Sequence, residues 1–558
     1  MVQKIFNALN KEISSIHGVA YLLGFFALIA QILALVRDRM LAGAFGAGTT
    51  LDIYYAAFRI PDLIFVTVAS LVSISILVPI MTNVMDDKER LQELINSIFI
   101  FFFSVIVFVS LVVFIILPYI TPKLFPGITG DDMQTLINLS RILLLSPIFL
   151  GLSNFFASII QLHNRFFLYA LSPILYNIGI IGGLVFLYPI WGLYGLVIGV
   201  CFGAFMHLGV QIPYIISEGR LPKIKTKIDY KEVLKIAILS IPRTVTLSAG
   251  SISIFFLIST ASLIGAGAIS IFNFSFNLQT APLSIIGVSY ASAIFPVLSR
   301  LYVEGKRSVY LEKMISVTKH IIFWSLPATA LFIVLRAQIV RTVLGTGNFG
   351  WSDTRLTAAA VAIFAISMIP QSLILIFVRA FYSEGKTKKP LILNVISMFA
   401  TILLAYLFLY IYQNSVVFSY FIQSLFRIED VQGSAVTMLA LAYTVGVSFN
   451  VLLHWIAFEK EYPSYTRSVL RNIFQSFSAS VILGLVSYRM LDVFDNFFNI
   501  NTVIGIFLQG LFSGLVGLSV GVLVLRLLKS KELDEVWKTL HRKIWKVDKN
   551  EVVLDKLL

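Results

Sequence analysis

The chain is built from apolar runs of roughly 20 or more residues, the length that a helix needs to cross a hydrocarbon layer about 30 Å thick. Of its 558 residues, 58% are hydrophobic and only 13% are charged, whereas soluble domains are about 25% charged. A soluble core could not bury so much uninterrupted apolar sequence. Because isolated strands leave backbone groups unsatisfied in lipid, the runs predict helices. The expected fold class is therefore an all-α polytopic membrane protein.

About fourteen transmembrane helices are predicted from these runs, the first two over residues 16–45 and 52–84. Internal prolines such as Pro147 predict kinks within them. Lysine and arginine gather in alternate loops and in the tail from residue 529 onward, which places both termini in the cytoplasm. The formal charge of +14 therefore follows membrane topology, and it does not indicate a nucleic-acid partner.

Three pairs of motifs recur at nearly one spacing, which indicates an internal repeat. The pairs are Pro173 and Asn177 with Pro390 and Asn394 at an offset of 217, Pro79 with Pro296 at 217, and Gly46 and Gly48 with Gly265 and Gly267 at 219. Paired repeats around a central cavity are typical of transporters. We therefore expect two six-helix repeats around a central cavity, plus two C-terminal helices.

The predicted organisation follows from this repeat. It comprises an N-lobe at 1–217, a cytoplasmic linker at 218–230, a C-lobe at 231–459, helices thirteen and fourteen at 460–530, and a cytoplasmic amphipathic tail at 531–558. Apolar residues along one helical face of the tail favour an interfacial helix. Residues 414–432 resemble an insertion, and we expect them to lie along the outer membrane surface.

Patterns typical of catalysis or metal binding are absent from the sequence. The six histidines are scattered without the spacing of metal ligands, and the single cysteine, Cys201, lies inside an apolar segment. No phosphate-binding loop of the GxxxxGK[ST] type is present. The sequence thus predicts a protein that is not an enzyme and that uses no cofactor and no metal.

Charged residues interrupt the first apolar hairpin, and they are the strongest candidates for function. They are Arg37, Asp38, Arg39, Asp52, Arg59 and Asp62. An ionisable side chain within a span is costly, so it usually faces a cavity and serves function. Arg37 lies deepest and is favoured, whereas Arg39, Asp52 and Asp62 could equally flank a helix end in water. Arg37 and Asp38 are neighbours that point in different directions on a helix, so they need not neutralise each other.

The same hairpin carries a family resemblance. Its sequence VRDRMLAGAFGAGTTLDIYYAAFRIPD resembles the first hairpin of the MurJ (MviN) lipid II flippases of the MOP exporter superfamily, and HNRFFLYALSPILYN, GTGNFGWSD and RAFYSEGKTKKP follow in the family's order. The resemblance covers about residues 18–530. It implies fourteen helices in two repeated halves and a lipid-linked substrate, undecaprenyl-pyrophosphate disaccharide-pentapeptide. Arginine suits such a substrate because its planar fork binds phosphate oxygens in pairs.

The chain departs from the family pattern at functional positions. The family carries essential arginines on helices one, two and eight. Arg37 matches the first of them, and Asp38 and Asp52 match the acidic residues beside it. The second arginine position falls on Phe65 and the third on Asn277. The chain is thus a divergent member by this resemblance.

Two interpretations of the missing arginines stay open. Other arginines take their place, with Arg59, Arg243 and Arg379 as candidates, or the substrate is not lipid II. Arg243 is the preferred substitute, although an arginine snorkelling to the cytoplasmic headgroups explains it equally well. The predicted substrate-binding residues are Arg37, Asp38, Asp52, Arg59, Arg243 and Asn277.

Three functions are compared at this stage. The favoured one is an alternating-access lipid II flippase of the bacterial cytoplasmic membrane, which acts in peptidoglycan synthesis and cell shape. Its predicted partners are lipid II, membrane lipids and cell-wall synthesis proteins, and it is expected to be a monomer. The alternatives are an exporter of another lipid-linked oligosaccharide or of a cationic drug, and a non-transporting cell-wall scaffold. A sodium site is not expected on helices seven and eleven, because no Asp or Glu lies between Glu232 and Glu304 or between Glu384 and Glu429.

Overall fold

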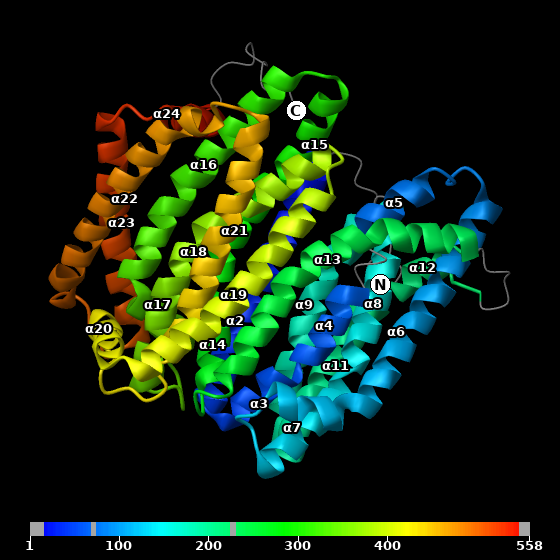
Figure 1. The fold of residues 1–558 in the computed structure, drawn as a ribbon, viewed down its shortest axis with the longest axis horizontal. Coiled ribbons are helices and arrows are strands. Elements are labelled where there is room, and N and C mark those ends of the chain that lie inside the picture. The colour runs from blue at the N-terminus through cyan, green and yellow to red at the C-terminus, as the bar shows by residue number, and fades with distance from the viewer. Residues whose placement is uncertain (1–15, 69–73, 164, 224–229, 546–558) are drawn as a thin grey trace. The chain divides into compact units, whose positions relative to one another are not determined.

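Every regular element among the described residues is a helix. The computed structural model describes residues 16–68, 74–163, 165–223 and 230–545. The chain forms two compact units (Figure 1): unit 1 is Met1–Ser270 with Thr346–Phe349, and unit 2 is Ile271–Gly345 with Gly350–Leu558. The predicted all-α polytopic class is confirmed.

Unit 1 contains thirteen of the described helical segments. They are α2 (Ile16–Phe45), α3 (Thr49–Ala57), α4 (Arg59–Val68), α5 (Ile74–Thr82), α6 (Lys88–Leu124), α7 (Gly130–Leu143), α8 (Leu145–Leu162), α9 (Phe166–Gly182), η2 (Gly183–Leu187), α10 (Tyr188–Trp191), α11 (Leu193–Gly209), α12 (Ile212–Ser217) and α13 (Tyr230–Ala261). Helices α9 and α11 approach closely, because glycines face each other across their contact. A Cβ atom on Gly179 would lie 2.2 Å from the Cα of Gly203. Small residues at such crossings are typical of helix packing in membranes.

Unit 2 contains the remaining helices, apart from the first three residues of α14. They are α14 (Ala268–Leu283), η3 (Ser284–Val288), α15 (Ser289–Val303), α16 (Arg307–Val334), α17 (Arg336–Leu344), α18 (Trp351–Ser383), α19 (Lys388–Asn414), α20 (Val416–Phe426), α21 (Val436–Glu461), α22 (Tyr465–Asp495), α23 (Val503–Leu527) and α24 (Lys531–Trp545). Helix α18 lies at the centre of this unit and packs against α15, α16, α17 and α21. Its alanine-rich middle, residues 358–365, is buried throughout.

The structure divides some predicted spans into shorter helices. The apolar run 133–161 becomes α7 and α8, which meet at Leu144 with Pro147 in the first turn of α8. The run 52–84 contains α3, α4 and α5, and Pro61 lies in the first turn of α4. Proline is tolerated in a first turn because no intrahelical bond needs its missing N–H. At Pro147, therefore, the chain starts a new helix where the sequence predicted a kink.

Twelve helical stretches in the described part of the chain are long and apolar enough to cross a membrane. The predicted span 16–45 corresponds to α2, and the predicted span 52–84 includes residues 69–73, which lie outside the description. Neither is among the twelve. Large apolar side chains remain exposed on the spans, as on α6, where Phe108 is 68% exposed and Ile115 67%. Apolar exposure on this scale would be a liability in water, so these surfaces face lipid.

The compact units do not follow the predicted lobe boundaries. Helix α13 falls in unit 1, whereas the repeat assigned residues 231–261 to the C-lobe. Compactness and repeat similarity are different criteria, so the lobes stay a prediction. Backbone conformation does agree with the repeat at one more pair of positions: Gly130 and Gly347, which are 217 residues apart, both have positive φ.

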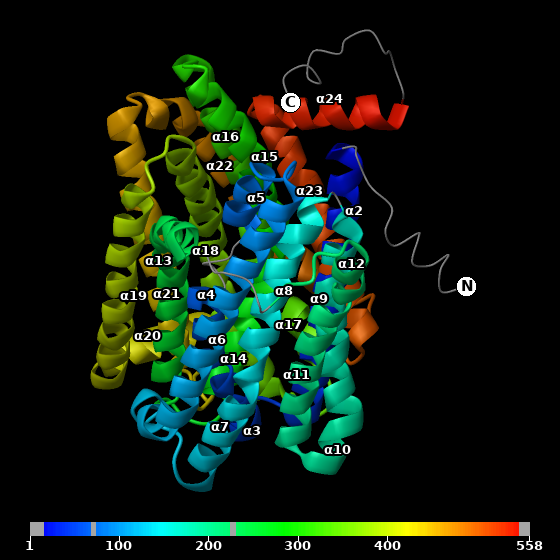
Figure 2. The same cartoon turned by 90° about the vertical axis from the view of Figure 1, so that its right-hand side faces the viewer.

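The predicted insertion and the predicted tail lie at opposite ends of unit 2 (Figures 1 and 2). Helix α20, within 414–432, buries Ile422 against Tyr412 and Met438. Helix α24 runs across the end of α23 (Figure 2) and packs Leu533 and Val536 against the bundle. The tail beyond residue 545 lies outside the description, and the outer-surface position of 414–432 stays a prediction.

Candidate functional site

The C-terminal part of α2 has an exposed apolar stripe on one face and a buried polar group on another. Leu28, Ile32 and Val36 are one helical turn apart and are all more than 40% exposed. The next residue, Arg37, has a side chain only 20% exposed, and that of Asp38 is 4% exposed. Because successive helical residues differ by about 100° in direction, Arg37 turns away from the exposed stripe.

Arg37 is held by two partners within unit 1. Its Nε and Nη2 atoms donate to Oδ1 of Asp38 at 3.0 Å and 2.8 Å. Its Nη1 atom donates to Oδ1 of Asn177 on α9 at 3.1 Å. Arg37 and Asp38 leave the helix in different directions, as expected for neighbours, but the long arginine side chain curls back onto Asp38 and the two form an ion pair. The pair is neutralised in this conformation.

Asn177 is a site residue that the sequence argument did not assign. Its side chain is buried, and its Nδ2 atom donates to the carbonyl of Pro173 one turn earlier at 3.0 Å. This bond orients the amide so that its oxygen faces Arg37. The repeat had already marked Pro173 and Asn177 as paired with Pro390 and Asn394. That signal could have identified Asn177, since Asn394 also bonds a side chain, accepting from Asn450 at 2.9 Å.

The end of α2 is fixed by a segment from much later in the chain. The backbone N–H of Asn348 donates to the carbonyl of Gly43 at 2.9 Å, and its side chain donates to that of Ala44 at 2.7 Å. These bonds satisfy carbonyls that a helix C-terminus leaves without partners. Gly46 has a φ of 64°, and a Cβ atom there would lie 2.7 Å from the carbonyl oxygen of Asn348. The motifs GAFGAGTT and GTGNFGWSD therefore meet at this end of the helix that carries Arg37.

Asp52 serves a different purpose from Arg37. Its buried carboxylate accepts from the backbone N–H of Gly267 at 2.7 Å, from that of Ser270 at 2.8 Å and from the Ser270 hydroxyl at 2.6 Å. These donors belong to the start of α14, where a carboxylate also compensates the positive end of the helix dipole. The geometry therefore favours a structural role for Asp52, which caps the start of α14. The carboxylate is buried, so it does not flank a helix end in water.

We expect Asp52→Ala to destabilise the protein by about 3 kcal/mol, because it leaves buried donors without an acceptor. Thermal unfolding of the purified protein in detergent would measure the change. Asp492→Ala, at an exposed position of α22, provides the control and should change stability little. Equal stability of the two variants would contradict the capping role.

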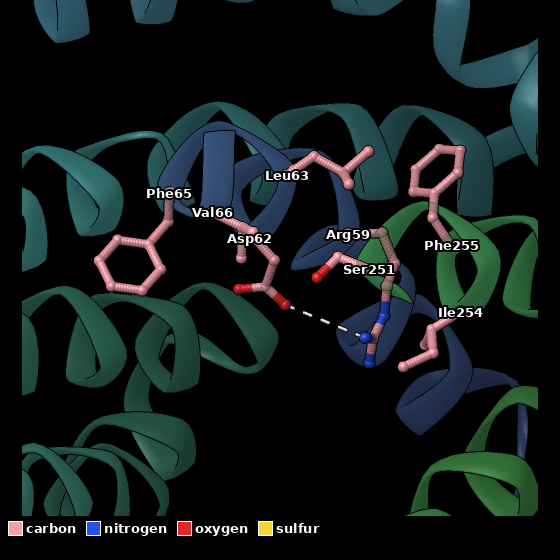
Figure 3. A pocket seen from close by; sticks show the side chains of 8 residues that line it. All are labelled: Arg59, Asp62, Leu63, Phe65, Val66, Ser251, Ile254 and Phe255. Carbon is pink, nitrogen blue, oxygen red and sulfur yellow. Dashed lines mark ion pairs between the residues drawn. The ribbon is translucent and has the colours of Figure 1, made fainter. Parts of the chain in front are cut away.

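A second polar group lies on α4, beside a cavity of about 170 Å³ (Figure 3). The cavity is lined by Arg59, Asp62, Leu63, Phe65 and Val66 of α4 and by Ser251, Ile254 and Phe255 of α13. The Arg59 side chain is 17% exposed, and its Nη1 atom lies 3.9 Å from Oδ2 of Asp62. Its Nε atom donates to the carbonyl of Tyr55 at 3.2 Å. Arg59 and Phe65, the position of the missing family arginine, therefore line the same cavity.

The other predicted residues are less clearly placed. Arg243 lies on α13, but its side chain is outside the described part of the structure. Asn277 is half-buried on α14 and belongs to unit 2. Arg379, also in unit 2, lies over the ring of Phe295 with its Cζ atom 5.2 Å from the centroid. Unit 1 thus brings together Arg37, Asp38 and Asn177 in one group, and Arg59 with Phe65 in another.

Unit 2 contains a polar network that the sequence argument missed. Gln279 of α14 accepts from Ser367 at 2.9 Å and from Gln371 at 3.1 Å, and Gln371 accepts from Tyr443 at 3.1 Å. Amides and hydroxyls leave little signal in an apolar sequence. Among the described residues, no group of three or more His, Cys, Asp or Glu side chains is arranged to hold a metal ion.

Comparison with known proteins assigns the family. The profile described as "Lipid II flippase MurJ" matches residues 41–513. The chain belongs to the MurJ family. The match begins just after Arg37 and Asp38, so the case for these two residues rests on their geometry.

Relatives and solved structures agree with this membership. The chain is 25% identical to a probable lipid II flippase MurJ from Thermotoga maritima over 93% of its length and 97% of the relative. It is 28% identical to one from Buchnera aphidicola over 70% of its length and 77% of the relative. A structure of the lipid II flippase MurJ in an inward closed conformation matches with a TM-score of 0.71 at 21% identity, over 94% of this chain and all of the other.

The fold is also shared with another transporter group. An inward-facing multidrug resistance transporter of the MATE family, in the MOP superfamily, matches with a TM-score of 0.61 at 16% identity, over 78% of this chain and 96% of the other. At this level of identity the likeness shows the fold alone. MurJ membership together with the apolar spans makes the chain a multi-pass membrane protein.

Proposed function

We propose that the chain is a lipid II flippase, which carries undecaprenyl-pyrophosphate-linked peptidoglycan precursor from the inner to the outer leaflet. The observation that carries the proposal is a shielded guanidinium at the end of α2, in a chain of the MurJ family. A shielded arginine is costly to keep in a membrane span, so it is retained for a ligand or a switch. A diphosphate is the anion that this family's substrate provides.

Arg37 suits this task because its partners leave donors unused. A guanidinium has five N–H donors, and the bonds to Asp38 and Asn177 occupy only some of them. The neutral amide of Asn177 is a weaker acceptor than a phosphate oxygen, since charge-assisted bonds are about twice as strong. A diphosphate would therefore displace Asn177, while Asp38 keeps the side chain oriented.

The alternative of a cationic-drug exporter has little support in unit 1. Such a carrier needs carboxylates available to a cation. Asp38 is paired with Arg37, and the carboxylate of Asp52 accepts bonds from the start of α14. Both are committed to other groups, and Asp62, which lines the cavity beside α4, lies 3.9 Å from Arg59. A cation would therefore have to compete with an arginine or a helix terminus.

The finer features of the proposal follow from the sequence. The chain is placed in the bacterial cytoplasmic membrane with both termini in the cytoplasm, and it transports by alternating access as a monomer, without enzymatic activity. Arg59 supplies the charge that the sequence resemblance assigns to Phe65, Asp52 caps the first residues of α14, and Arg243 and Asn277 remain predicted substrate-binding residues.

The test is complementation of a bacterial strain that can be depleted of its own lipid II flippase. We expect this chain to restore growth and to make lipid II accessible to an enzyme added outside the cells. If a different lipid-linked oligosaccharide reached the outer leaflet and lipid II did not, the protein would still be a flippase, but its substrate would not be lipid II. Normal expression with no transport of either lipid would overturn the proposal.

A further inference from the structure

Unit 2 contains a second cavity, separate from the groups described above. Its volume is about 450 Å³, and it lies where several helices of this unit end or begin. The residues that line it are Tyr302, Arg307, Ser308, Leu311, Lys386, Glu461, Tyr462 and Pro463. They come from the end of α15, the first turns of α16, the α18–α19 turn and the end of α21.

A buried carboxylate organises one wall of this cavity. The side chain of Glu384 is fully buried; it accepts from the hydroxyl of Tyr462 at 2.8 Å and forms an ion pair with Lys386 at 2.7 Å. Glu461 pairs with Lys386 and with Lys389. Burial alone would lower the pKa of Lys386, but its bonds to the two glutamates raise that pKa above its ordinary value. The two lysines and two glutamates are therefore paired, and this wall is close to neutral.

Arg307 supplies the excess positive charge. It is exposed beside the cavity, and no carboxylate in the described part of the chain pairs with it. It is also the first residue of the 28-residue helix α16, whose N-cap residue Lys306 provides no side-chain hydrogen bond. Backbone N–H groups in the first turn of a helix lack intrahelical acceptors and attract anions. In α16 the N–H of Arg307 itself donates to the carbonyl of Gly305 at 2.9 Å, so the N–H groups of the next residues in that turn face an anion. The Ser308 hydroxyl adds a donor at the same place.

We propose that this cavity binds the phosphate group of an anionic membrane lipid. Arg307 and the first turn of α16 face the phosphate, and Tyr302 and Leu311 contact the carbon atoms next to it. The position of the cavity favours a lipid over a soluble phosphate. The membrane-span candidates Ala268–Val303 and Val436–Glu461 both end at the cavity, where lipid headgroups would lie. Val303, beside Tyr302, is 85% exposed and extends this apolar surface toward the acyl chains.

The test measures lipid binding to the purified full-length protein in neutral detergent. Phosphatidylglycerol is titrated against phosphatidylcholine, and inorganic phosphate is tested as a competitor. Arg307→Gln is expected to weaken phosphatidylglycerol binding about fivefold, the contribution of one basic residue near a phosphate surface. Phosphatidylcholine binding should not change. Thermal unfolding of the variant would verify that its fold is intact.

Arg467→Gln is the matched control, because Arg467 is an exposed arginine at the start of α22 that does not line the cavity. It makes the same charge change and should retain full phosphatidylglycerol binding. Competition by millimolar inorganic phosphate would support the phosphate chemistry and assign the site to a soluble anion. Equal losses in Arg307→Gln and Arg467→Gln would overturn the proposal, because attraction to the basic surface would then explain the binding.

Discussion

An Arg37→Ala variant is expected to leave a flippase-depleted strain unable to grow, although the protein is made and inserted. The change removes the guanidinium that Asp38 and Asn177 hold at the end of α2. Loss of the charge-assisted contact that we propose between this guanidinium and the diphosphate costs about 3 kcal/mol, which corresponds to roughly a hundredfold slower transport. Growth after depletion and lipid II translocation in reconstituted vesicles measure these effects.

Two further variants separate charge from geometry at this position. Arg37→Lys keeps the charge but has no planar fork, so it cannot bond Asp38 and a ligand in the same arrangement; we expect partial activity. Asn177→Ala keeps the guanidinium and removes only a neutral partner, and its effect should be the smallest. Normal growth with Arg37→Ala at native expression would remove Arg37 from the mechanism.

The fold class could be predicted from the sequence because it depends on a local quantity, the length of each apolar run. Helix breaks depend on more than hydropathy. The break at Leu144 separates α7 from α8 inside one apolar run, and Pro147 is compatible with either a kink or a new helix start. Which one forms is decided by how α7 and α8 pack against α6 and α11, and that information is not local.

The difference between local and non-local information also explains which site residues could be predicted from the sequence. Arg37 was identifiable because a charge within an apolar helix is unusual wherever its partner lies. Asn177 was missed because a neutral amide gives no such signal, and it is 140 residues away. The role of Asp52 was missed for the opposite reason. The charge was visible, but its donors at Gly267 and Ser270 lie more than 200 residues later.

The replacement of the second family arginine can be tested by moving the charge within one cavity. Arg59→Gln is expected to slow lipid II translocation about tenfold or more, because it removes the guanidinium from the cavity between α4 and α13. Phe65 lines the same cavity, and the sequence resemblance assigns the family's second arginine to its position. The double variant Arg59→Gln with Phe65→Arg should therefore recover most of the lost rate.

The matched control is Arg59→Gln with Phe65→Leu, which changes the volume at the same position without adding charge. It should stay as slow as Arg59→Gln alone. If Phe65→Leu also restored the rate, removal of the phenylalanine ring from the cavity, and not the added charge, would explain the recovery. Full activity of Arg59→Gln would leave Arg37 as the main cation of unit 1 for the diphosphate and would exclude Arg59 as the substitute. If Phe65→Arg restores the rate of Arg59→Gln and Phe65→Leu does not, transport requires a guanidinium in this cavity, and either position can supply it. A chain of this family could then keep its function with the arginine at residue 59.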